Sequence, residues 1–217
     1  MFVGDRMSHP VITIAPAASL NDAWHLMNRV HISRLPVVDS RGRMVGIVSL
    51  KQLLRYMPSE ATTLDVYEIK GAMNSIKIEA IMTRNVITVT ADTPIEEAAR
   101  IMVDNEIGGI PVVEGESLVG IITETDLFKV FLEVLGAREP GIRMTVSLLK
   151  VPGQLAVLFQ AIFNAGGNVI SVGTFQGHTS TTNEVTIKVE GIAKDALEAL
   201  VTPLVTQVLD VRETSAM

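Results

Sequence analysis

Thr123 and Asp126 are the pair of residues in this chain whose type and spacing could do chemistry. They follow the apolar run Gly120–Ile122, which is typical of a buried strand, and they stand where the pattern changes to that of a helix. In one interpretation the pair only caps the helix, because each side chain can accept from a backbone N–H at its start. In the other, the carboxylate accepts from both hydroxyls of a ribose, and the helix N-terminus attracts a phosphate. The pair therefore predicts either a helix cap or a nucleotide site.

The composition limits the other kinds of site. The chain has 217 residues, of which 47% are hydrophobic, with a formal net charge of −6 and no cysteine. The acidic balance and scattered basic residues argue against a nucleic-acid partner, and thiol nucleophiles are excluded. No apolar run could span a bilayer and no signal-like segment opens the chain, so we expect no membrane association and a cytoplasmic location. The four histidines show no metal-ligand spacing, so no metal site is expected: His9, His25, His31 and His178.

The chain contains an internal repeat, in which the segment that begins at Met7 returns at Met82. Three further segments match in the same order: Val11–Ile14 with Val86–Val89, Leu35–Val38 with Ile110–Val113, and Val45–Ser49 with Val119–Thr123. Each copy is predicted to contain a first strand, over 11–14 and 86–89, then a helix, two strands joined by a hairpin turn, and a second helix.

Capping signals place the first helix of each copy. In the first copy Ser19 is the expected cap, and the apolar face that follows includes Trp24, which we expect in the core. In the second copy Thr93 is the expected cap, with Pro94 at the first helical position and Glu96 completing a capping box.

The second helices and the linker set the expected boundaries. The helices are predicted over Leu50–Met57, ended by Pro58, and over Glu124–Leu135, ended by Gly136. The polar stretch between the copies is expected to be a partly helical linker. The predicted division is residues 1–58 for the first repeat, 59–75 for the linker and 76–136 for the second repeat.

Over about residues 7–135 this pattern resembles the tandem CBS-domain pair, or Bateman module. The resemblance rests on Met82-Thr83, the Val86–Val89 segment, Gly109–Val113 and Gly120–Asp126. It implies a regulatory sensor, not an enzyme, with AMP, ADP, ATP or S-adenosylmethionine as regulatory ligand and no required cofactor. The ligand contacts that it implies are Thr88, Gly109, Ile110, Pro111, Thr123 and Asp126 in the second copy, and Thr13, Arg34, Leu35, Pro36 and Ser49 in the first.

The first copy departs from the second at two positions. Gln52 stands where the second copy has Asp126, and a neutral amide is a poorer acceptor for a diol than a carboxylate. Whether the first copy binds a ligand therefore stays open. Arg34 stands in place of Gly109, where it could reach a phosphate, obstruct the adenine or simply face solvent.

Beyond Gly136, residues 137–141 read as a hinge into a different pattern. Strands are predicted over 143–149, 169–175, 184–189 and 208–211, with a helix after Pro152-Gly153 and another from Lys194, ended or kinked by Pro203. This β-α-β-β-α-β order predicts an antiparallel sheet with helices on one face, so the whole chain is expected to be of mixed α/β and α+β class.

Residues 142–212 resemble an ACT domain, with Lys150–Leu155 in the place of that family's Asp-x-Pro-Gly-x-Leu turn. The resemblance implies a ferredoxin-like regulatory domain over 142–217 that often binds an amino acid, here beside Gly153 and Asn168. Lys150 and Val151 replace the family's acidic or amide residue, so amino-acid binding stays open. Asn168 is also compatible with a polar residue in a loop that enters a strand. Two CBS copies followed by an ACT domain is similar to the arrangement of acetoin-utilisation proteins of the AcuB type.

These patterns favour a ligand-sensing protein that regulates an unknown partner. Two alternatives stay open: a structural dimerisation protein without nucleotide, and a hydrolase using Thr123 and Asp126, for which no His base or metal cluster is visible. A homodimer or larger homo-oligomer is expected, because a sheet with helices on one face leaves an apolar face to bury.

Overall fold

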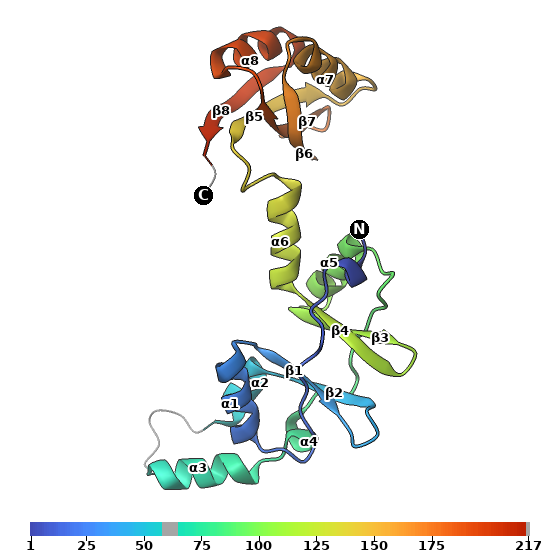
Figure 1. Cartoon of the computed structure of the whole chain (residues 1–217), viewed down its shortest axis with the longest axis vertical. Helices are drawn as coiled ribbons and strands as arrows, with labels where there is room; N and C mark the ends of the chain where they lie inside the picture. The colour runs from blue at the N-terminus through green and yellow to red at the C-terminus, as the bar shows by residue number, and fades with distance from the viewer. Residues whose placement is uncertain (58–64, 216–217) are drawn as a thin grey trace. The chain divides into compact units, whose positions relative to one another are not determined.

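The computed structural model describes residues 1–57 and 65–215. The chain divides into two compact units, Met1–Leu127 and Phe128–Met217, and the division falls inside helix α6 (Figure 1). The predicted helix end at Pro58 lies outside the described residues.

The first unit contains both repeats. The first repeat supplies α1 (Leu20–Val30), β1 (Arg34–Val38), β2 (Met44–Ser49) and α2 (Leu50–Tyr56), and the second supplies α5 (Ile95–Asp104), β3 (Gly109–Glu114), β4 (Ser117–Thr123) and α6 (Glu124–Val134). Short turns of helix, η1 (Val3–Asp5) and α4 (Ile78–Ile81), open the two copies. The described part of the linker forms α3 (Val66–Ser75), which confirms that the linker is partly helical.

The cap predicted for the first helix is confirmed, and the cap predicted for its counterpart is wrong. The Ser19 hydroxyl accepts from the Asp22 N–H at 3.1 Å, and the Asp22 carboxylate accepts from the Ser19 N–H at 2.9 Å. Helix α5 instead begins at Ile95 with Pro94 as its cap residue. The Thr93 hydroxyl accepts from the Thr90 N–H at 3.2 Å, so a local turn has taken the group that was expected to cap the helix.

Trp24 lies on the predicted apolar face of α1 but is only partly buried. It packs against a core that contains the fully buried Leu20, Ala23 and Met27. The expectation of a core position therefore holds only for part of the indole.

The strands predicted over 11–14 and 86–89 are wrong, because each segment makes only one isolated bridge. Ile14 bridges Val37 in parallel, donating to the Pro36 carbonyl at 3.0 Å, and Val89 bridges Val112 in the same way. A longer parallel ladder would need a donor at the N–H of Pro36, and proline has none. Pro111 imposes the same limit in the second repeat.

The opening segment of each repeat packs on the other repeat. Ser8 pairs with Ile121 through two backbone hydrogen bonds of 2.9 and 3.1 Å, and Thr83 pairs with Ile47 through two of 2.9 Å. Figure 1 shows η1 beside α5, and Val3 of this turn is buried in the core of the second repeat. The two repeats therefore form one unit by exchanging their first turns.

The second unit has the element order expected from the sequence. Its elements are β5 (Gly141–Leu149), α7 (Gln154–Asn164), β6 (Asn168–Gln176), β7 (Thr182–Glu190), α8 (Lys194–Val201), η2 (Thr202–Leu204) and β8 (Gln207–Thr214). All strand pairs are antiparallel, in the order β6-β7-β5-β8. Helix α8 ends just before Pro203, as predicted. Figure 1 shows α7 and α8 on one side of the sheet, over the buried residues of β5 and β7.

The other face of this sheet, which was expected to be apolar, is polar along β5 and at Lys188 of β7. Between its buried residues β5 presents Arg143, whose Nη1 lies 2.9 Å from a carboxylate oxygen of Asp210, and Thr145, whose hydroxyl lies 2.9 Å from that of Thr186. Lys188 is 3% exposed on β7, and its Nζ donates to the carbonyls of Gly136 (2.7 Å) and Glu139 (2.5 Å). Along β5 and at Lys188 this face therefore gives no hydrophobic reason for the chain to pair through the sheet.

Candidate functional site

Thr123 and Asp126 meet at the junction of β4 and α6. Oδ2 of Asp126 accepts from the Thr123 N–H at 3.0 Å and from the Thr123 hydroxyl at 2.7 Å. Asp126 is 6% exposed. The hydrogen bonds to the helix start predicted for this carboxylate are therefore formed, and one of its oxygens carries both of them.

Strand β3 lies alongside this pair. Gly109 is directly opposite Thr123 in the antiparallel register, and the N–H of Glu124 donates to the Gly108 carbonyl at 3.2 Å. Ile110 and Pro111 follow in β3 with buried side chains. Gly109, Thr123 and Asp126 thus come together at one end of the hairpin, where β3 offers mainly backbone groups.

Thr88 does not join this cluster. It lines a hollow of about 460 Å³ with Val113 and Gly115, near the hairpin turn, and with Arg43–Val45 of the first repeat. Thr13 occupies the matching position in the first repeat, in a hollow of about 440 Å³. These two predicted contacts therefore lie in hollows that Thr123 and Asp126 do not line.

The matching end of the first hairpin is closed by side-chain hydrogen bonds. Arg34 is opposite Ser49 in the register, and Leu35 and Pro36 are buried in β1. The Gln52 carbonyl oxygen accepts from the Ser49 N–H at 2.8 Å and from its hydroxyl at 3.1 Å. The predicted residues of the first copy are thus brought together, with Gln52 completing the helix cap.

The Arg34 side chain reaches from the first repeat to the second. A Cβ built on Gly108 would overlap Nη2 of Arg34 and Oε2 of Glu124, and one built on Gly109 would lie 3.1 Å from Cδ of Arg34. The two glycines therefore leave the space that the guanidinium occupies. Partial burial lowers the pKa of Arg34, while the negative charge of Glu124 acts in the opposite direction.

Glu124 is a residue that sequence reasoning missed. It lies next to Thr123, and its carboxylate and the guanidinium of Arg34 both lie against Gly108. The signal that could have found it is the pair Gly108-Gly109, which stands where the first copy has Ser33-Arg34. Any anion that binds near Arg34 must therefore compete with the Glu124 carboxylate for the guanidinium.

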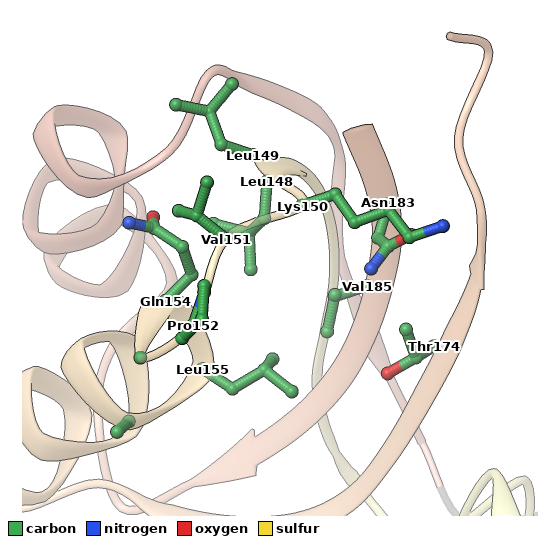
Figure 2. A pocket seen from close by; sticks show the side chains of 12 residues that line it. Leu148, Leu149, Lys150, Val151, Pro152, Gln154, Leu155, Thr174, Asn183 and Val185 are labelled. Carbon is green, nitrogen blue, oxygen red and sulfur yellow. The ribbon is translucent and has the colours of Figure 1, made fainter. Parts of the chain in front are cut away.

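The two residues predicted to bind an effector in the second unit are not brought together. Gly153 is the N-cap of α7, with φ of 89°, and it lines a cavity of about 430 Å³ (Figure 2). Asn168 is exposed at the start of β6, where its Nδ2 donates to Oε1 of Glu190 at 2.7 Å, and it does not line that cavity. Of the two predicted residues, Gly153 therefore lines this cavity and Asn168 does not.

The described residues include neither a membrane-spanning helix nor a cluster of metal-ligating side chains. No helix in that part of the chain has the length and apolar character needed to cross a membrane. No group of three or more His, Asp or Glu side chains there could hold a metal ion.

Two solved structures are each similar to 64% of this chain. The chain matches the CBS domain pair of protein MJ0100, solved with 5′-methylthioadenosine and S-adenosyl-L-methionine, at 32% identity and a TM-score of 0.51, over 64% of this chain and 98% of that one. It matches a proposed acetoin utilization protein (AcuB) from Vibrio cholerae at 31% identity and a TM-score of 0.53, with the same coverage.

Sequence comparison also finds a similar protein and a matching family model. The uncharacterized protein MJ1225 of Methanocaldococcus jannaschii is 37% identical over 135 residues, which are 59% of this chain and 46% of that protein. The chain thus spans less than half of that relative's length. The model of the CBS domain matches residues 3–59 and 78–133, which includes both repeats. The chain belongs to the CBS-domain family.

Proposed function

We propose that the first unit is a regulatory sensor that binds one adenosine-containing ligand at the second repeat, beside Thr123 and Asp126. The observation that carries this proposal is the convergence of three features at one point. These are the buried carboxylate of Asp126, the backbone of Gly109 and the Arg34 side chain from the other repeat. A solved CBS pair with 5′-methylthioadenosine and S-adenosylmethionine supports the same ligand class.

Each of these groups suits one part of such a ligand. The backbone of Gly109, Ile110 and Pro111 offers donors and acceptors to the edge of an adenine, and a carboxylate can accept from both hydroxyls of a ribose. Because the Thr123 hydroxyl already donates to Asp126, a ribose must share or replace that bond. Arg34 is the group for a phosphate, which would compete with the nearby negative charge of Glu124 for the guanidinium.

Thr13 and Thr88 have a weaker claim to a ligand role. They lie in hollows near the hairpin turns, whose ionisable lining residues are His9 beside Thr13, and Arg43 and Glu116 beside Thr88. Neither hollow is lined by Thr123 or Asp126, so the ligand proposed here does not depend on Thr13 or Thr88.

Calorimetric titration of the full chain with AMP, ATP, 5′-methylthioadenosine and S-adenosylmethionine tests the sensor function. At least one ligand should bind with a stoichiometry near one per chain. If none produces heat or a thermal shift at millimolar concentration, the module serves only as a structural unit. ATP turnover above that of a Thr123→Ala variant would instead favour the hydrolase, which lacks an activated nucleophile in the described site.

We further propose that the second unit is an effector domain of the ACT type. The observation in its favour is the β-α-β-β-α-β order together with the cavity beside the Pro152-Gly153 turn. An effector there would act on the regulated partner jointly with the adenosine ligand, which requires two states of different affinity. A homodimer also remains a prediction, and sedimentation of the full chain at micromolar concentration measures it.

A further inference from the structure

The cavity at the start of α7 has an apolar wall and a polar rim. The wall is made by side chains of β5, the turn, α7 and β7: Leu148, Val151, Pro152, Leu155 and Val185. Figure 2 shows the polar side chains of Lys150, Thr174 and Asn183 around the other side of the opening. Its volume of about 430 Å³ is that of a small-molecule site.

Exposed apolar side chains surround this opening. Leu149 and Val151 are each 50% exposed, and Leu155 is 37% exposed. Covering such surface with an aliphatic group is favourable, because apolar area is removed from water. The cavity therefore favours a ligand with a branched or linear hydrocarbon body.

The charges around the cavity favour an anionic head group. The 12 lining residues include Lys150 and no Asp or Glu. Asn183 is in the lining, but the acidic residue next to it, Glu184, is not, and its carboxylate lies 3.1 Å from Nε2 of His178.

The start of α7 adds to this preference, whereas the N–H groups of the turn before it are already paired. The N–H groups of Lys150 and Val151 already donate to the carbonyls of Thr181 and Leu149. Gly153 brings no side chain to cap α7, so the first N–H groups of that helix are available to an anion at the cavity.

We propose that this cavity binds a small aliphatic carboxylate and selects against the ammonium group of an amino acid. The proposal rests on the effector role proposed for the second unit, and it names the chemical class of the effector. A carboxylate gains Lys150 as its counter-charge. An ammonium group at the same place loses its water and meets a lysine, with no acidic side chain among the lining residues to replace that water.

Three probes of the same shape separate these charges in the full chain: 4-methylpentanoate, L-leucine and L-leucinamide. Calorimetry should show 4-methylpentanoate binding at least tenfold more tightly than leucine, and leucinamide not binding. Lys150→Met should weaken 4-methylpentanoate by about tenfold or more, because a charge-assisted contact is lost. Lys194→Met, a lysine of α8 outside the cavity lining, is the matched control and should leave the affinity unchanged.

The outcomes separate this proposal from the one on which it depends. If leucine or leucinamide binds as tightly as 4-methylpentanoate, the cavity is an effector site but the inferred charge selection is wrong. If none of the three binds at millimolar concentration, the effector role of the second unit fails together with the inference. Because Lys150 is exposed, its substitution should leave the thermal midpoint unchanged, so lost binding in the variant would report the lost charge.

Discussion

The amide nitrogen of Gln52 donates to the hydroxyl of Thr83 across 2.8 Å, joining the start of α2 to the opening segment of the second repeat. The amide oxygen of Gln52 accepts from Ser49, so both ends of this side chain hold the fold. An aspartate cannot donate in this way and is one methylene shorter. The first repeat therefore uses for packing the position at which the second repeat carries Asp126.

Gln52→Asp should lower the stability of the fold and strengthen ligand binding by the first repeat. Loss of the bond to Thr83 should lower the free energy of unfolding by about 1 kcal/mol. The new carboxylate should create or strengthen an adenosine site in the first repeat. Arg34 should not block that site, because its side chain is directed toward the second repeat. The calorimetric stoichiometry should therefore rise from near one toward two. Thr83→Val is the matched control, since it removes the same hydrogen bond and adds no charge. Equal stoichiometry in the two variants would refute a site in the first repeat.

Arg34 and Glu124 should affect phosphorylated ligands selectively. Arg34→Met is expected to weaken AMP by roughly tenfold, through loss of a charge-assisted contact, and to leave 5′-methylthioadenosine nearly unchanged. Glu124→Gln should strengthen AMP, because it removes the competing carboxylate. Titration of both ligands measures the effects, with Glu96→Gln in the first turn of α5 as a control for a lost surface charge. If Arg34→Met weakens both ligands equally, the guanidinium supports the fold of the site and does not bind phosphate.

Gly46→Ala should destabilise the first unit. A Cβ at this position would lie 2.7 Å from the sulfur of Met82 and 2.8 Å from the carbonyl oxygen of Thr83. Since the carbonyl belongs to the backbone that pairs with Ile47, the exchanged segment must shift, at a cost of about 1–3 kcal/mol. Urea unfolding measures this. Gly71→Ala in α3, where a Cβ meets nothing within 4 Å, should be neutral or stabilising, and an equal loss in both variants would contradict the packing argument.

Lys188→Met should loosen the turn that follows α6. It leaves the carbonyls of Gly136 and Glu139 without the donor that they now have, which should cost about 1–3 kcal/mol. Hydrogen exchange should rise first in residues 136–141. Unchanged exchange there, with Lys194→Met as the control, would show that the buried lysine does not hold the turn.

The sequence predicted the elements whose signals are local. Periodicity located α1 and both hairpins, because the apolar residues of an element face the core that it helps to form. The alternation of Arg143 and Thr145 with apolar residues in β5 also indicates that one face of this strand is polar. The strand predicted over residues 11–14 does not form, because Pro36 in the neighbouring strand β1 has no N–H to donate.

The features that sequence could not supply depend on contacts between the copies. Gly46 is small because Met82 of the other repeat lies against it, and Gly108 is small because of Arg34 and Glu124. No local pattern records such a partner. The same applies to Gln52, which satisfies the capping pattern of its own helix while its second bond goes to Thr83.

Asp126→Asn, measured by calorimetric titration with AMP and S-adenosylmethionine, tests the central claim most directly. The amide oxygen of Asn can still accept from Thr123, so the free energy of unfolding should change by at most a few tenths of a kcal/mol. If the carboxylate holds the ribose, loss of its charge should weaken the ligand by roughly 10- to 150-fold, which corresponds to about 1.5–3 kcal/mol. A variant that is equally stable and binds as tightly as the parent would contradict the account, and would leave Asp126 as a helix cap alone.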